Sequence, residues 1–101
     1  KLTTINEVKT RFLQSQVFWI FLPKKIEIEH SIDGENFELI YEVYPKNDFS
    51  FVQDIFTYSA NPKNIKTRYI KVKAMNINEC PEYHPGSGGP SWIFSDEIII
   101  N

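Results

Sequence analysis

The side chains best suited to chemistry lie far apart in this sequence. His30 and His84 are well separated, and no nucleophile forms a recognisable motif beside either of them. Asp96 and Glu97 are neighbours on a predicted strand, where successive side chains point to opposite faces, so they do not make the facing carboxyl pair of a glycosidase. We therefore expect this chain to have no catalytic centre.

The best candidate for a binding site is a segment rich in glycine and proline. Residues 76–91, NINECPEYHPGSGGPS, contain three of the four glycines and three of the six prolines, and they predict a long loop. A sugar is recognised by an exposed aromatic face flanked by groups that hydrogen-bond its hydroxyls. Tyr83 would form that face, and His84 or Glu82 would reach a hydroxyl. Further polar side chains lie near the start of the loop: Asn76, Asn78 and Glu79.

Each aromatic candidate also has a structural alternative. Tyr83 and His84 would then only hold the loop on the rest of the fold. Trp19 is either an aromatic residue at the rim of the sugar-binding end or a plug that closes the fold, and we favour the plug. Trp92 and Phe94 share one strand parity, so we expect both to enter the core.

Two further residues are expected to be structural. His30 lies on the apolar side of a predicted strand, where a histidine usually bonds a neighbouring carbonyl. The single cysteine, Cys80, excludes an internal disulfide and a cysteine-rich zinc site, and we expect an unreactive loop thiol.

Composition and charge limit the class of protein. The 101 residues suffice for one hydrophobic core, so we expect a single domain over residues 1–101. The net charge of −2 disfavours nucleic acid as a partner, and the apolar run at residues 17–22 is far too short to span a membrane. Basic side chains cluster in one region, which we interpret as a solvated strand face: Lys63, Lys66, Arg68, Lys71 and Lys73.

Alternating apolar and polar residues predict strands throughout the chain. Strands are expected within residues 2–13, 25–43, 51–58, 68–75 and 92–101, with Asp33 and Gly34 forming a tight hairpin turn inside the second range. Ile26, Ile28 and His30 should share one face, and the apolar run at residues 98–100 suits a strand buried on at least one face. Loops are expected at residues 45–50 and 61–67, and no segment has helical periodicity. The pattern predicts an all-β antiparallel sandwich or jelly roll.

Three motifs resemble the F5/8 type C, or discoidin-like, galactose-binding-like domains. IEIEHSIDGENFELI is similar to that family's strand, hairpin and return strand; TRYIKVKA is similar to its "ARYIRV" strand; and FSDEIII is similar to its closing strand. RFLQSQVFWIFLPKKIEI and NECPEYHPGSGGPSWIFSDEI look like the form found at the C-terminus of bacterial exo-β-N-acetylhexosaminidases, or chitobiases. The resemblance implies a discoidin-like jelly roll and an accessory, non-catalytic role.

The resemblance also implies partners, a location and a metal. The catalytic domain of the parent glycoside hydrolase would lie upstream, and the protein would be secreted, periplasmic or on the bacterial cell surface. Related domains often use a glutamate of the closing strand, here Glu97, as a ligand of a structural calcium ion. The other ligands would come from an early part of the domain that the resemblance does not find here, so Glu97 would be either one donor of an incomplete site or, as we favour, a solvated glutamate without a metal.

The opening strand and loops of such domains have no counterpart in this sequence. We expect their absence to expose strand edges and to make residues 1–101 less stable than a longer piece of the parent protein.

The sequence supports two hypotheses of function. The first is a carbohydrate-binding module for glycans of the N-acetylhexosamine or galactose type; the second is a structural docking or oligomerisation domain that binds no sugar.

Overall fold

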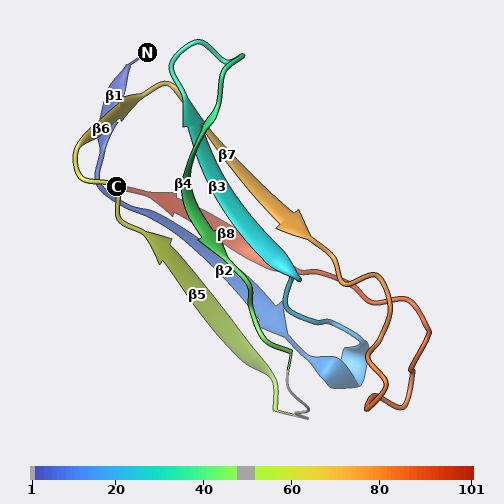
Figure 1. Ribbon diagram of the computed structural model, residues 1–101. Coiled ribbons are helices and arrows are strands. Elements are labelled where there is room, and N and C mark those ends of the chain that lie inside the picture. The colour runs from blue at the N-terminus through green and yellow to red at the C-terminus, as the bar shows by residue number, and fades with distance from the viewer. Residues whose placement is uncertain (1, 48–51) are drawn as a thin grey trace.

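The protein is almost entirely β-structure. A computed structural model describes residues 2–47 and 52–101, shown in Figure 1. The first half contains four strands: β1 (Thr3–Ile5), β2 (Val8–Gln14), β3 (Lys25–Ser31) and β4 (Glu38–Val43). The second half adds four more: β5 (Asp54–Ala60), β6 (Ile65–Thr67), β7 (Tyr69–Met75) and β8 (Ser95–Ile100). A single 3₁₀ turn, η1 (Gln16–Phe18), interrupts the connection from β2 to β3.

Two three-stranded sheets make up the body of the fold. One has the order β5-β2-β8 and the other the order β4-β3-β7, while β1 and β6 form a separate two-stranded sheet. Every strand pair is antiparallel. The predicted all-β antiparallel sandwich is therefore confirmed, and the jelly-roll connectivity stays a prediction.

The sandwich follows from alternating burial along its central strands. In β2, the side chains of Val8, Thr10, Phe12 and Gln14 are buried and those between them are partly exposed. In β3, Ile26 and Ile28 face the same core, as the alternation predicted. Two apolar clusters result, and Val72 of β7 packs against both: Ile5, Val8, Ile28 and Ala60 form the first, and Phe12, Leu22 and Ile26 the second.

Several boundaries differ from those predicted. The predicted first strand is divided at Asn6 and Glu7 into β1 and β2, and β6 lies inside the predicted loop at residues 61–67. Backbone pairing with β1 explains β6, because Ile5 faces Ile65 across the two strands. The predicted loop at residues 45–50 lies partly outside the described residues, as does the start of the predicted strand at 51–58.

The hairpin between β3 and β4 is longer than the expected tight turn, because six residues join Ser31 to Glu38. Asp33 organises them: its Oδ1 accepts the backbone N–H groups of Glu35 and Asn36 and the hydroxyl of Ser31. Gly34 has φ of +82°, a conformation that glycine adopts without strain. These hydrogen bonds lower the pKa of Asp33 from its usual value, the backbone N–H of Asn36 contributing most.

The closing strand is more exposed than its sequence predicted. Trp92 and Phe94 are 62% and 52% exposed, so the expectation that both enter the core is wrong. Their parity is opposite to the one expected, because Ile93 between them packs against the second apolar cluster. Trp92 and Phe94 do lie on the same side of the chain, as expected, but the buried side is the one that carries Ile93.

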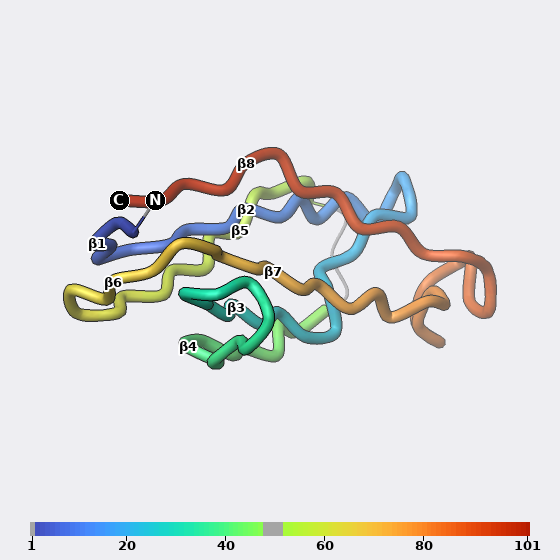
Figure 2. The backbone as a smooth tube through the Cα atoms, turned by 90° about the horizontal axis from the view of Figure 1, so that it is seen from above, coloured from blue at the N-terminus to red at the C-terminus, as the bar shows by residue number. Residues whose placement is uncertain are grey.

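The side of the sandwich at β8 is open. Ile98 and Ile100 pair with Thr10 and Val8, which are fully buried, and directly paired residues of antiparallel strands share a face. Yet Ile98 and Ile100 remain 51% and 48% exposed, so the described residues cover the inner face of β8 only in part. Figure 2 shows β8 and β4 at opposite margins of the molecule.

The overall shape agrees with an incompletely covered core. The principal extents are 47, 24 and 17 Å, and the Cα radius of gyration is 15.4 Å. A compact domain of this length has a radius of gyration of about 13 Å. Figure 1 shows the β3–β4 hairpin near one end and the long loop after β7 at the other.

Candidate functional site

The loop at the lower end of Figure 1 is ordered by its own backbone hydrogen bonds. The N–H of Cys80 donates to Gly89 O, and the N–H of Gly88 donates back to Cys80 O. A further turn closes where the N–H of Gly89 donates to Gly86 O, at 2.8 Å. The predicted long loop is confirmed, and these bonds give it a defined conformation.

Trp19 supports this loop from the β2–β3 connection. Its ring packs so closely on the loop that a β-carbon on Gly86 would lie 2.6 Å from Cζ2, and one on Gly89 would lie 2.8 Å from Cζ3. Trp19 itself has φ of +63°, in the left-handed region. Both loop glycines are therefore required by close approach of an aromatic ring, a reason the sequence alone did not reveal. Trp19 is half-buried and packs on the loop, and its expected role as a rim aromatic or as a plug stays a prediction.

His84 is buried beneath the loop and both of its ring nitrogens are engaged. Its Nδ1 lies 2.9 Å from the backbone N of Gly86, which donates to it, so Nδ1 is the acceptor. Nε2 must then carry the proton and donate to Gln16 O, at 2.7 Å. The ring edges also meet Trp19 and Phe21 at centroid distances of 5.9 and 5.2 Å. This geometry makes His84 an anchor of the loop and leaves no ring nitrogen for a hydroxyl of a ligand.

Tyr83 and Glu82 lie on the outside of the same loop and are exposed. The Tyr83 hydroxyl donates to Asn47 O at 2.8 Å, which fixes the ring relative to the β4 end. Asn47 is itself held, because its side chain exchanges two hydrogen bonds of 2.8 Å with the backbone of Leu22. A partly exposed aromatic ring beside an exposed carboxylate is thus presented on a tethered loop.

Asn76 and Asn78, at the start of the loop, stabilise its backbone conformation. Asn78 has φ of +72° and its backbone N–H is accepted by Oδ1 of Asn76. The same Oδ1 accepts the hydroxyl of Ser91, and Nδ2 of Asn76 donates to Ser91 O. The Asn78 side chain is exposed, and Asn76 joins the two ends of the loop. The role of Asn78 in recognition stays a prediction.

Asp96 and Glu97 do not point to opposite faces as expected. Arg11 Nη2 lies 2.9 Å from Asp96 Oδ2, and Arg11 Nη1 lies 3.7 Å from Glu97 Oε2. The reason is a register shift, since Arg11 pairs with Glu97 but the next residue, Phe12, pairs with Ser95. The resulting bulge leaves Asp96 without a partner in the ladder and brings both carboxylates to one guanidinium.

A calcium ion does not fit the described residues around Glu97. Its carboxylate faces the guanidinium of Arg11, a fixed cation that would repel a metal ion. Among residues 2–47 and 52–101, no group of three or more histidine, cysteine, aspartate or glutamate side chains could hold a metal. Glu97 therefore acts here as an ion-pair partner of β2.

Cys80 is buried in the loop, and burial raises the pKa of its thiol. Its Sγ lies 3.5 Å from Pro90 O, the acceptor of a weak S–H hydrogen bond. A protonated, buried thiol is a poor nucleophile. This agrees with the structural role expected for it.

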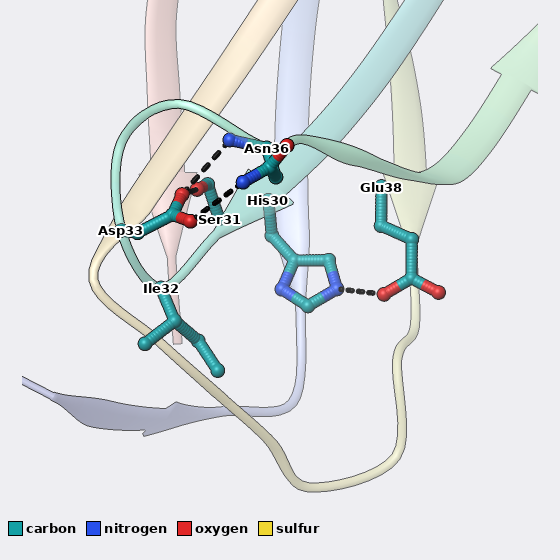
Figure 3. Close-up of a pocket in the computed structure, with 6 residues that line it drawn as sticks. All are labelled: His30, Ser31, Ile32, Asp33, Asn36 and Glu38. Carbon is teal, nitrogen blue, oxygen red and sulfur yellow. Dashed lines mark hydrogen bonds and ion pairs between the residues drawn. The ribbon is translucent and has the colours of Figure 1, made fainter.

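A second candidate lies at the other end of the sandwich, in the β3–β4 hairpin. Figure 3 shows this pocket of about 220 Å³, and its lining residues are His30, Ser31, Ile32, Asp33, Asn36 and Glu38. His30 and Glu38 are directly paired across the two strands, and His30 Nε2 lies 3.5 Å from Glu38 Oε2. His30 Nδ1 lies 3.3 Å from the hydroxyl of Thr67, so its partner is a side chain and not the carbonyl expected.

This pocket was not predicted from the sequence. The expected two-residue turn would have brought His30 and Glu38 out of register, because the true loop is six residues long and β4 contains a register shift opposite Ile28 and Glu29. A usable signal was present in the spacing of Ser31, Asp33 and Asn36, which suits a side-chain-capped turn.

Comparison with known proteins gives no assignment. No family model matches this chain, and no curated protein is significantly similar to it. In the part of the chain that the structure describes, no helix has the length and apolar character needed to cross a bilayer.

Proposed function

We propose that this chain is a non-catalytic carbohydrate-binding module, accessory to a bacterial glycoside hydrolase of the β-N-acetylhexosaminidase type that acts outside the cytoplasm. The family is suggested by the hairpin, strand and loop motifs of the sequence. The structural support is the loop end, where the Tyr83 ring and the Glu82 carboxylate are exposed on a loop that is already ordered.

Order in the free loop favours recognition of a small ligand. Binding a sugar to a mobile loop would cost conformational entropy, whereas Trp19 and His84 hold this loop before any ligand arrives. The Tyr83 ring would stack on the C–H face of a pyranose, and Glu82 would accept a hydrogen bond from a hydroxyl. His84 supports the site from below and does not contact the ligand.

Calorimetric titration with N-acetylglucosamine, N-acetylgalactosamine and galactose at millimolar concentration tests this site. Tyr83→Ala should weaken binding by about tenfold or more, equivalent to about 1.4 kcal/mol. Tyr69→Ala is the control, because Tyr69 is a similarly exposed tyrosine that packs on Gly34 in the distant hairpin. Absence of heat with every sugar, or equal affinity of the Tyr83 and Tyr69 variants, would reject the proposal.

A second function is favoured by the open side at β8. Ile98 and Ile100 expose apolar surface from the inner face of the sheet, and such surface commonly marks a protein interface. The edge strands of the two sheets also differ in charge, since β7 contains Lys71 and Lys73, whereas β8 contains Asp96 and Glu97, which already contact Arg11. We propose a second copy of this chain as the occupant, with the β7 edge of one copy beside the β8 edge of the other.

Sedimentation velocity over a range of protein concentrations tests self-association. Ile98→Ser together with Ile100→Ser should abolish a concentration-dependent dimer with little loss of folding stability, because both side chains are already half exposed. The matched control is Leu39→Ser, an exposed leucine on β4. A chain that remains monomeric at every concentration contradicts this second function.

A further inference from the structure

The hairpin pocket is a second cavity, separate from the loop end. It lies at the other end of the sandwich, and its walls come from the end of β3, the six-residue loop and the first residue of β4 (Figure 3). His30 and Glu38 form one wall and Ile32 the other, with Ile32 more than half exposed.

The hydrogen bonds of Thr67 determine where His30 carries its proton. The Thr67 hydroxyl has one hydrogen, and its two carbonyl neighbours are Ser31 O at 2.9 Å and Tyr69 O at 3.2 Å. Towards His30 Nδ1 the hydroxyl must therefore accept, which places a proton on Nδ1. In the neutral ring, Nε2 is then a bare acceptor that faces the Glu38 carboxylate at 3.5 Å. In this tautomer, a donor group of a ligand placed between the two atoms would bond both of them.

The donors around the pocket are directed elsewhere. The Ser31 hydroxyl donates to Asp33 Oδ1, and an Asn36 amide hydrogen bonds Asp33 Oδ2. Asp33 is held ionised by these bonds, and Glu38 adds a carboxylate whose side chain is 86% exposed. The pocket therefore presents acceptors and negative charge, a combination that selects a ligand with several donors and a positive charge.

We propose that this pocket binds an amino sugar whose amino group is free, that is, a hexosamine without its acetyl group. The ammonium group would donate to Glu38 and, in the neutral ring, to His30 Nε2. The apolar face of the sugar ring would lie on Ile32. A volume of about 220 Å³ is sufficient for one monosaccharide unit and small for a longer glycan.

This inference rests on the proposed function in one respect, because it takes the ligand to be a sugar. The inference differs from the proposed function in the site and in the chemical group that is recognised. The loop end would recognise a neutral sugar through Tyr83, whereas the hairpin pocket would require the ammonium group. Occupation of both ends by one glycan chain would increase the overall affinity through an intramolecular second contact.

A chemical-shift titration of the isotopically labelled chain tests the proposal at each site separately. At about pH 7, methyl glucosaminide keeps much of its amine protonated, and it should shift the signals of His30, Ile32 and Glu38. Methyl N-acetylglucosaminide, which lacks the charge, should leave these signals unchanged. Glu38→Gln should weaken the glucosaminide response at least fivefold, and Glu42→Gln, an exposed glutamate of β4 outside the pocket, should not weaken it.

The remaining outcomes separate the role of the ammonium group, the role of the sugar and the two sites. Equal shifts with the acetylated sugar would remove the role of the ammonium group. Equal affinity for butylamine would remove the role of the sugar. Shifts confined to Tyr83 would leave the proposed function standing and reject the hairpin site, whereas hairpin shifts without any at Tyr83 would reject the loop end and support this site.

Discussion

The ring of Trp19 lies against Gly86 so closely that a single added methyl group would be 2.6 Å from its Cζ2 atom. This relationship joins the β2–β3 connection to a loop more than sixty residues later in the chain. It also explains why the loop can be ordered although it has no strand or helix of its own.

Gly86→Ala should lower the free energy of unfolding by about 1–3 kcal/mol, because the new methyl group overpacks the Trp19 contact. Urea denaturation measures this loss. In a Trp19→Ala background the Gly86→Ala penalty should disappear, since the clashing ring is gone. Ser87→Ala is the control, because Ser87 is exposed and its hydrogen bond to His84 O uses the backbone N–H, which the substitution keeps. An equal penalty in both backgrounds would show that the contact is not the cause.

His84→Phe should destabilise the protein by about 1–3 kcal/mol although an aromatic ring is kept at this position. The substitution leaves the N–H of Gly86 without its acceptor and removes one of the two hydrogen bonds that Gln16 O accepts, the other coming from the N–H of Trp19. An unmet buried group costs about 1–3 kcal/mol. Amide hydrogen exchange at Gly86 should increase in parallel. A variant with unchanged unfolding free energy would mean that packing, and not the two hydrogen bonds, holds the loop.

Asp33→Asn should destabilise the hairpin at neutral pH, and the difference from the wild type should shrink in acid. The folded state lowers the pKa of Asp33, so the unfolded state takes up the proton first as the pH falls. The stabilisation is thus complete above the ordinary value of 3.8 and is lost progressively below it. Thermal melts from pH 7 downwards measure this, with Glu35→Gln in the same loop as control. A difference that does not vary with pH contradicts the assignment.

Ile28→Ala should cost about 2–4 kcal/mol, because Ile28 is fully buried in the first apolar cluster and its removal leaves a cavity. Leu39→Ala, on the neighbouring strand but exposed, should cost less than about 1 kcal/mol. Urea midpoints of the two variants compare them directly. Similar losses would mean that the interface between the sheets does not dominate stability.

The predictions from sequence were most accurate where the pattern was strictly local. The alternation around Ile26 and Ile28 predicted β3 and its buried face, and Lys71 and Lys73 lie on the exposed face of β7 as expected. The predictions failed where a change of one residue in register decides the outcome. Trp92 was wrongly assigned to the core because the buried side of its segment is shifted by one residue. Asp96 and Glu97 were wrongly placed on opposite faces because of the bulge at Asp96. The sugar-binding assignments of Tyr83 and Glu82 stay predictions.

The sequence by itself determined that this chain forms short antiparallel strands around an aromatic and aliphatic core. The reason is that apolar and polar residues alternate along each strand, so that one face is buried. Only the tertiary structure decided which residues meet: Trp19 with Gly86, His84 with Gln16, and His30 with Glu38. The physical reason is that such contacts depend on register and loop length, where one residue reverses the direction of a side chain. The hydrophobic pattern predicts each strand, but it does not specify those offsets.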